Sequence, residues 1–320
     1  MQIGVFTALW GNLSFEEALD KAASFGLTAV EIGAGGYPGQ PHCPVDELLD
    51  SESKRQEWLG QIQGRGLTLS ALSVHNNPVH PDPEVAGEAD KVIRKAIELA
   101  ALLNVPTVNG FSGLPGGAAG DSMPNWVTCA WPPHFLEILE YQWDEVTIPY
   151  WQSIHPLLEE NDITFGFEMH PGILVYNVDT LLRLREAVGP RLGCNFDPSH
   201  LWWNGVDPVA AIRKLGDAIF HVHGKDVYVD RFNTEVNGCN DHKHYGDIAQ
   251  RSWTFRSIGY GHDLKVWRDM MSALRLIGYD YVVSIEHEDA LMSPDEGLAK
   301  AVDTLEQAVM LEEAGEMFWA

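Results

Sequence analysis

The 320-residue sequence predicts one α/β domain, residues 1–320, folded as a single closed (β/α)8 barrel. Two observations predict it. Short β-type runs alternate with amphipathic helical stretches along the whole chain, and strands separated by helices pair in parallel because a parallel return needs a long crossover. The rhythm amounts to eight strand–helix units, which favours a closed barrel over the alternative, a doubly wound open sheet. The chain length suits one large core.

The first half of the chain contains four of the expected strands, at residues 3–7, 28–32, 67–74 and 106–111. Ser14 and Glu17 form a capping box, in which a hydroxyl and a carboxylate satisfy free amide groups at a helix start. That helix is expected to reach Phe25 and to stop at Gly26. Two further helices are expected, at residues 54–63 and 84–103.

The second half repeats this rhythm. We expect strands at residues 163–167, 192–196, 218–222 and 281–285, and helices at residues 180–188, 208–215, 264–277 and 294–312. Three connections exceed plain turns, at residues 33–50, 112–133 and 223–262, and each follows a strand, so each lies over the C-terminal face of the barrel. Long loops inside a compact domain are usually functional. The second of them carries Trp126 and Trp131, as in a lid or a subunit contact.

The composition excludes several classes of function. With 21 basic and 46 acidic residues the net charge is −25, which repels a phosphate backbone, so we expect no nucleic-acid partner. The four cysteines are widely spaced without a C-x-x-C pattern, which indicates a reducing compartment. The N-terminus does not resemble a signal peptide, and no apolar stretch approaches the roughly 18 residues of a membrane span. We therefore expect a cytoplasmic protein with no membrane partner.

The most informative feature is what ends four strands of the second half. Glu168, Asp197, His223 and Glu286 each lie at the end of an apolar strand, and the ends of parallel strands meet on one face of a barrel. Any one of them alone is as well explained by a salt bridge, a helix cap or a hydrogen bond. Together, three partly desolvated carboxylates would repel one another unless a cation neutralises them. This ligand set suits one divalent ion: Mn2+, Mg2+, Co2+ or Zn2+.

His221 and His223 flank Val222 on the same expected strand. We expect only one of them to face the site. His223 lies nearer the strand end and is the expected ligand, and His221 is expected to be packed or hydrogen-bonded outside the barrel.

The order Glu168, Asp197-x-x-His200, His221-x-His223 and Glu286 resembles the sugar isomerase/epimerase superfamily of xylose-isomerase-like TIM barrels. This superfamily includes ketose 3-epimerases, inosose-processing enzymes, hydroxypyruvate isomerase and metal-dependent apurinic endonucleases. The resemblance covers nearly the whole chain through the barrel rhythm. It implies an octahedral metal held by the two glutamates, the aspartate and His223, with substrate oxygens completing the shell. It also implies that Glu168 and Glu286 act as the acid/base pair and that His200 contacts substrate oxygen.

The implied reaction is that of a metal-dependent isomerase or epimerase of carbohydrate metabolism. One glutamate removes the proton next to a keto-sugar carbonyl, giving a metal-bound enediolate, and the other returns a proton. Asp197 and His223 remain pure ligands. Three further residues are weaker candidates for contacting the sugar. The alternative interpretation of His75 is a simple turn, and that of Lys225 and Asp226 is an ordinary ion pair in a loop. The sequence leaves open whether the chain forms a homo-oligomer.

Other functions remain possible on the same barrel. A 3-keto-glycoside lyase or hydrolase would use the same proton abstraction, and the long connection 223–262 would suit its larger substrate. An apurinic endonuclease would need more histidines at the strand ends and a basic groove. A noncatalytic sugar binder would have no reason to keep both glutamates. The extra histidines His242 and His244 are read as a second metal site or, with better support, as part of a lid.

Overall fold

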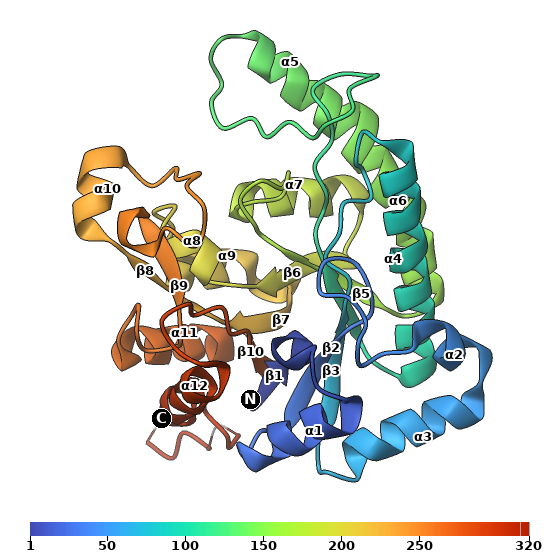
Figure 1. Cartoon of the computed structure of the whole chain (residues 1–320), viewed down its shortest axis with the longest axis vertical. Coiled ribbons are helices and arrows are strands. Elements are labelled where there is room, and N and C mark those ends of the chain that lie inside the picture. The colour runs from blue at the N-terminus through green and yellow to red at the C-terminus, as the bar shows by residue number, and fades with distance from the viewer. Residues whose placement is uncertain (314, 320) are drawn as a thin grey trace.

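The computed structural model describes residues 1–313 and 315–319. Its centre is a closed barrel of parallel strands in the order β1-β10-β7-β6-β5-β4-β3-β2 (Figure 1). The barrel strands are β1 (Gln2–Phe6), β2 (Ala29–Gly33), β3 (Thr68–Ser73), β4 (Thr107–Gly110), β5 (Thr164–Glu168), β6 (Leu192–Phe196), β7 (Ile219–Gly224) and β10 (Val282–Ile285). This confirms the expected (β/α)8 barrel, and each strand matches its expected range to within about a residue or two.

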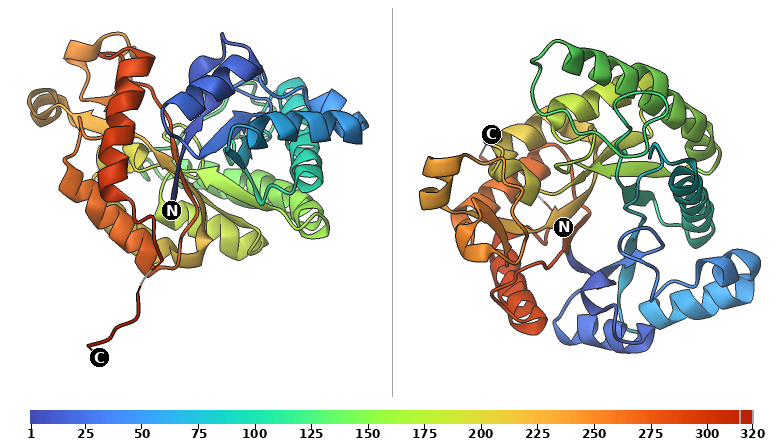
Figure 2. Two further views of the ribbon diagram at one scale, coloured as in Figure 1. Left: turned by 90° about the horizontal axis from the view of Figure 1, so that it is seen from below. Right: turned by 45° about the horizontal axis from the view of Figure 1, so that its top comes forward.

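The helices surround this barrel, and the right view of Figure 2 shows them following one another round the ring in chain order. They are α1 (Phe15–Ser24), α2 (Val45–Asp50), α3 (Glu52–Gln63), α4 (Pro83–Leu103), α5 (His134–Glu140), α6 (Ile148–Glu160), α7 (Val178–Val188), α8 (Ser199–Trp202), α9 (Pro208–Leu215), α10 (Arg231–Asn237), α11 (Leu264–Leu276) and α12 (Pro294–Ala308). The capping box of α1 is confirmed, since the Ser14 side chain accepts from the Glu17 amide and the Glu17 carboxylate accepts from the Ser14 amide. The last helix ends at Ala308, earlier than expected.

The long connections contain more regular structure than the sequence indicated. The first holds α2, and the second is followed by a continuous helical stretch of α5, the π-helical turn η2 (Tyr141–Thr147) and α6. In the third, β8 (Asp226–Val229) and β9 (Trp253–Arg256) form an antiparallel pair with α10 and the short turn η4 (Ile248–Gln250) between them. We call residues 226–256 the β8–β9 excursion. It projects beside the barrel mouth in Figure 1.

Two register irregularities lie in the middle of barrel strands. The register shifts between Val30 and Glu31 against β3, and between Cys194 and Asn195 against β7. Bulges commonly re-aim side chains beside functional sites. Here each bulge lies next to a polar residue, Glu31 or Asn195, that is fully buried in the barrel.

The apolar core lies between the barrel and its helices, with large buried side chains such as Trp151, Trp267, Phe165 and Phe167. The inside of the barrel is polar by contrast. Glu31, Asn109, Asn195 and His221 are all buried there and hydrogen-bonded to barrel residues. A polar barrel interior offers hydrogen-bond partners to the charged groups at the strand ends above it.

No helix among residues 1–313 and 315–319 combines the length and the apolar character needed to cross a membrane.

Candidate metal centre

Four acidic or imidazole side chains from neighbouring strands meet at the C-terminal end of the barrel. Glu168 is the last residue of β5, Asp197 follows β6, His223 lies near the end of β7, and Glu286 follows β10. Each offers one ligand atom, and these atoms all lie within 4.8 Å of one another. The structure therefore brings together the four residues expected to hold a metal. Glu168, Asp197 and His223 are buried, and Glu286 is partly exposed towards the mouth.

The imidazole of His223 is at the centre of this group. Its Nδ1 lies 3.2 Å from Oε2 of Glu168 and 3.1 Å from Oε2 of Glu286. Among the described residues, neither Nδ1 of His223 nor Oδ2 of Asp197 makes a well-directed hydrogen bond, although both atoms are buried. Their contacts are ion pairs only: Oδ2 of Asp197 lies 3.3 Å from Nε2 of His200 and 3.4 Å from Nζ of Lys225. Buried polar atoms are nearly always hydrogen-bonded in proteins, so these two need another partner.

A divalent cation fits that need. Three carboxylates and an imidazole nitrogen are ligands that such ions accept, and a cation between them would neutralise carboxylates that now face one another. The side chains that would hold it are Glu168, Asp197, His223 and Glu286. The donor set does not separate manganese from zinc, magnesium or cobalt.

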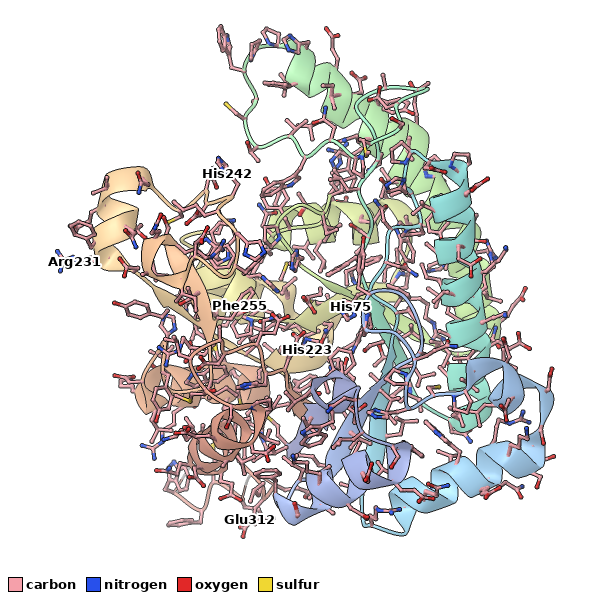
Figure 3. All side chains as sticks on the ribbon, viewed as in Figure 1. His75, His223, Arg231, His242, Phe255 and Glu312 are labelled. Atoms are coloured by element: carbon pink, nitrogen blue, oxygen red, sulfur yellow. The ribbon has the colours of Figure 1, made fainter. Side chains whose placement is uncertain are left out.

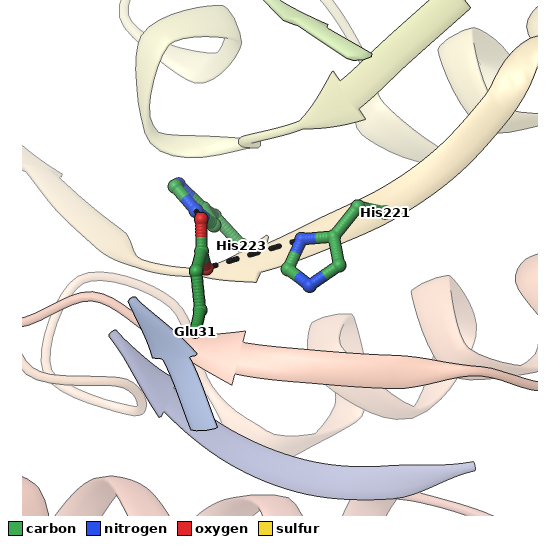
Figure 4. Close-up of side chains that lie close together, drawn as sticks. All are labelled: Glu31, His221 and His223. Atoms are coloured by element: carbon green, nitrogen blue, oxygen red, sulfur yellow. Dashed lines mark hydrogen bonds and ion pairs between the residues drawn. The ribbon is translucent and has the colours of Figure 1, made fainter. Parts of the chain in front are cut away.

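The far side of the His223 ring is fixed by Glu31. His223 Nε2 lies 3.0 Å and 2.9 Å from the two carboxylate oxygens of Glu31. Figure 4 shows these two side chains together with His221. Asn109 donates to the same carboxylate at 3.0 Å, and Ser73 donates to it as well. A carboxylate that accepts from one ring nitrogen leaves the other nitrogen free to bind a metal. The sequence suggested Glu31 only as a polar residue on the floor of the site.

The charges in this region are strongly linked. Burial would raise the pKa of Glu31, but His223 and His221 hold it below its usual value. Burial would lower the pKa of His223, but Glu31, Glu286 and Glu168 raise it well above the usual value. Nδ1 of His223 can carry either a proton or a metal ion, but not both. Binding of a metal ion there would therefore release the proton.

His221 corrects one expectation. It lies inside the barrel, fully buried, with Nδ1 3.0 Å from Oδ1 of Asn195 and Nε2 3.2 Å from Oγ of Ser70. Residues two apart on a strand point to the same side, so His221 and His223 both face inward. His221 also lies 4.0 Å from Glu31, and Glu31, His221 and His223 form a cluster below the four-residue site (Figure 4).

Two further histidines hold Glu168. His75 Nε2 lies 3.0 Å from Oε2 of Glu168, and His200 Nε2 lies 3.1 Å from Oε1. Burial would raise the pKa of Glu168, but His75, His200 and His223 keep it well below the usual value, so its carboxylate is ionised. Burial would lower the pKa of His200, but Asp197 and Glu168 raise it to about 9. The structure thus places both His75 and His200, expected to contact the sugar, against Glu168. Figure 3 shows His75 and His223 over the centre of the barrel.

Lys225 carries the positive charge closest to the site. Its Nζ lies 3.0 Å from Oε2 of Glu286, 2.8 Å from Oε2 of Glu288 and 3.4 Å from Oδ2 of Asp197. Burial would lower the pKa of Lys225, but Glu286, Glu288 and Asp197 raise it well above the usual value. Glu288 was missed from the sequence, because it lies in the irregular segment after β10, where strand alternation does not say which way a side chain points.

Asp226 does not join this group. Its Oδ2 accepts from the backbone amides of Gly259, Gly261 and His262 at 3.0 Å each, and its Oδ1 lies 2.8 Å from the His262 ring. A side chain on Gly261 would strike the backbone of Val227 at 2.2 Å, so the loop needs glycine there to reach the carboxylate. The expectation that Asp226 contacts substrate is therefore corrected: its carboxylate anchors the loop that returns from the excursion.

A cavity of about 230 Å³ opens above the four residues. Glu168, Glu286 and Lys225 line its floor, and Phe6, Tyr37 and Phe111 form its apolar walls. Small-molecule sites typically combine apolar walls with a few placed polar groups. His242 and His244 are not among the residues that surround this cavity or form the metal-binding groups found in the described residues.

Comparison with known proteins agrees with this architecture. The family model described as xylose isomerase-like TIM barrel matches residues 19–308. YfiH of Bacillus subtilis, a protein without a described function, is 42% identical over 97% of this chain and 99% of its own. An inosose dehydratase of Geobacillus thermodenitrificans is 26% identical over 92% of this chain and 89% of its own.

Solved structures with low sequence identity share the fold. The IOLI protein, crystallised with a zinc atom, has a TM-score of 0.66 at 17% identity, covering 97% of this chain and 98% of its own. A D-tagatose 3-epimerase-like protein has a TM-score of 0.63 at 22% identity, covering 96% of this chain and 97% of its own.

Proposed function

Because this chain belongs to the xylose isomerase-like TIM barrel family, we propose that it is a divalent-metal-dependent enzyme that moves a proton next to the carbonyl of a keto-sugar. The reaction class we favour is isomerisation or epimerisation. One observation carries the proposal: ligand atoms of Glu168, Asp197, His223 and Glu286 meet within 4.8 Å at the barrel mouth, and buried Nδ1 of His223 and Oδ2 of Asp197 make no well-directed hydrogen bond among the described residues. The epimerase-like neighbour and the zinc-containing neighbour support it.

When bound, a divalent cation polarises a carbonyl oxygen and lowers the barrier to removing the adjacent C–H proton. The chain's own residues then divide the work. Glu168 and Glu286 are the proposed acid/base pair, because both are carboxylates that line the cavity in which the sugar would lie. One takes the proton, leaving an enediolate, and the other returns a proton to the opposite face or to the neighbouring carbon. Proton transfers of this kind contribute about a hundredfold to ten-thousandfold each.

The surrounding residues keep this pair in the required state. His75 and His200 hold both oxygens of Glu168, which fixes the orientation of its carboxylate. Lys225 lies against Glu286 and keeps its charge compensated in a buried setting. His75 and Lys225 line the cavity and are proposed to contact sugar oxygens, and His200 is proposed to do so from beside Glu168. The proposed ligand is a small sugar and not a nucleic acid, in keeping with the net charge of −25.

The second candidate is elimination on the same barrel. The proton next to a ketone passes to a glutamate, the C–O bond one carbon further breaks, and the departing oxygen takes a proton, which leaves an unsaturated ketone. Atoms and electrons balance without any oxidant. The dehydratase among the relatives supports this class of reaction, and so does the space beside the metal centre described below.

One experiment tests the proposal. The purified protein is analysed for bound metal and then incubated in deuterated water with a panel of keto-sugars, and exchange of substrate C–H for deuterium is followed by NMR. We expect exchange that depends on the divalent metal. A protein that binds the metal and the sugars but exchanges no C–H hydrogen would be a binding protein, and the proposed chemistry would be wrong. Formation of a new epimer or isomer, or of an unsaturated ketone, separates the two reaction classes.

A further inference from the structure

A second pocket opens beside the mouth of the barrel. It lies between the long loop after β4, the turn after β5 and the β8–β9 excursion, and its volume is about 390 Å³. The rings of Trp126, Trp203, Tyr245 and Trp253 line it, and we call it the aromatic pocket. A pocket lined by several aromatic rings favours the binding of a flat or apolar group.

The aromatic pocket adjoins the cavity above Glu168. His170 lines both this pocket and the cavity above Glu168. An adjoining recess of about 130 Å³ between Trp126 and Trp203 reaches His200, whose ring lies 4.2 Å from the His170 ring. Only His170 and His200 therefore stand between a molecule held over Glu168 and the aromatic pocket.

The pocket wall is built into the fold. Trp203 and Trp253 stack with centroids 4.7 Å apart and planes at 10°. Beneath them Phe255 meets the His200 ring edge-on at 5.3 Å, and Lys225 Nζ lies 4.5 Å from the Phe255 ring. Figure 3 shows Phe255 beside the histidines of the barrel mouth. The excursion thus carries the pocket wall directly against residues of the proposed site.

The chemistry of the lining favours an uncharged ring. The carboxylate of Asp241 is used by Lys243 and by the amide of Ser252, at 3.0 Å and 2.6 Å. The guanidinium of Arg251 does not line the pocket and lies over the rings of Tyr245 and Trp253 at 4.2 Å and 4.6 Å. Charges already engaged in this way offer little to an ionic ligand. Thr128, Asn240 and His242 add polar groups to the lining, but four aromatic rings form its wall, which suits an apolar ring better than a second sugar.

We propose that the substrate is a keto-glycoside whose apolar, ring-bearing aglycone occupies the aromatic pocket while its sugar lies over Glu168 and Glu286. This inference rests on the proposed function, because it takes the sugar to be bound at the metal centre. It names the substrate class: a two-part molecule, not a free monosaccharide.

The test compares ligands that differ only in the aglycone. Calorimetry measures binding of 4-nitrophenyl and methyl 3-keto-glycosides derived from glucose, galactose, mannose and xylose to the metal-loaded protein, and failure of all of them to bind would overturn the inference. For the sugar that binds, we expect the 4-nitrophenyl compound to bind about tenfold more tightly, as aromatic packing allows. Trp126→Ala should remove that preference by deleting a wall of the pocket. Asn240→Trp should remove it by filling the pocket from an exposed position.

A matched control lies on the same loop. Trp131 is 74% exposed and does not line the pocket, so Trp131→Ala should keep the preference. Circular dichroism checks that each variant is folded. Equal binding of methyl and 4-nitrophenyl compounds for all four sugars would overturn the inference, and so would a preference that survives in both pocket variants. The 3-keto derivative of cellobiose binding as tightly as the 4-nitrophenyl 3-keto-glucoside would replace the apolar aglycone with a second sugar and overturn the proposal as stated.

The proposed function is tested separately on the same preparations. Deuterium exchange into free keto-sugars without any aglycone preference would remove the aromatic pocket from the substrate site and leave the proton chemistry in place. An aglycone preference without exchange would keep the aromatic pocket as part of the binding site and refute the proposed proton chemistry.

Discussion

Oε2 of Glu31 lies 2.9 Å from Nε2 of His223, on the side of the imidazole opposite to the nitrogen that faces Glu168 and Glu286. The contact joins a residue of β2 to one of β7, across the inside of the barrel. It fixes which ring nitrogen of His223 is available, so its effect should be measurable in metal affinity.

Glu31→Gln should weaken divalent-metal binding about 10- to 100-fold, the usual effect of losing a carboxylate behind a histidine ligand. The amide still fits the space but no longer holds the ring by a charged hydrogen bond. Isothermal titration with Mn2+ and Zn2+ measures the change. Glu57→Gln, on the exposed face of α3, is the control and should bind as the wild type does. Unchanged affinity in Glu31→Gln would remove Glu31 from the metal site.

Chelation should destabilise the protein. An ion that binds only the folded state adds about 2.7 kcal/mol when its concentration is one hundred times its dissociation constant. Treatment with a chelator should therefore lower the melting temperature, and added Mn2+ should restore it. Differential scanning calorimetry gives the shift. A melting temperature that is the same in chelator and in excess metal would argue against a bound cation between Asp197 and His223.

Glu286→Gln should reduce deuterium exchange into substrate by at least about a hundredfold, because the amide cannot carry a proton to or from carbon. The variant should keep its fold, since Glu286 lies after β10 and is partly exposed towards the cavity. Metal content is measured on the same sample, which separates loss of the ligand from loss of the acid/base group. Exchange at the wild-type rate would refute the assignment. Glu306→Gln, exposed on α12, serves as the control.

Asp226→Asn should lower the free energy of unfolding by about 2–4 kcal/mol, because a buried carboxylate that accepts several hydrogen bonds becomes an amide with one acceptor oxygen. Urea denaturation measures the loss. Asp269→Asn, in an exposed ion pair with Lys265 on α11, should change it by less than about 1 kcal/mol. Equal effects of the two substitutions would show that Asp226 does not anchor the 259–262 loop.

Asp289 gives a prediction about pH. Its Oδ2 accepts from Ser257 at 2.8 Å and from Arg256 at 3.0 Å, and its Oδ1 accepts from Leu291 at 2.8 Å. Burial opposes ionisation, but these amides and Arg256 lower the pKa of Asp289. A depressed pKa contributes stability above the unfolded-state value of about 3.9, and that contribution disappears as the pH falls through the folded-state pKa.

Asp289→Asn should therefore cost about 1–2 kcal/mol of unfolding free energy at pH 7, and progressively less than that below about pH 4. Urea titrations of both proteins between pH 3 and pH 7 give the difference. A cost that stays constant over this range would mean that ionisation of Asp289 contributes nothing. Asp217→Asn, at a carboxylate that is 92% exposed, is the matched control.

The strands and the strand-end residues could be predicted because both follow from local patterns. Apolar runs mark the barrel strands, and a carboxylate or an imidazole directly after such a run must lie on one rim. Glu168, Asp197, His223 and Glu286 were found in this way, and the structure brings their ligand atoms within 4.8 Å. Their role as metal ligands stays a prediction.

Contacts across the barrel were harder to predict. That Glu31 reaches His223 depends on how two strands far apart in the chain face each other, and a bulge beside Glu31 alters that register. Asp226 follows a strand as Asp197 does, yet its carboxylate turns to amides of residues 259–262 that no local pattern connects with it. The strands of the excursion were missed because they are short and pair only with each other.

The two ends of the excursion lie opposite each other, since Asp226 pairs with Arg256 in the antiparallel register. Asp226 ties one end to the 259–262 loop and Asp289 ties the other to the segment after β10. The intervening chain can therefore lengthen, shorten or be exchanged without altering the spacing at which it leaves and rejoins the barrel. Transplanting residues 227–255 between related barrels would exchange the aromatic wall beside His200 while the two anchored ends stay in place.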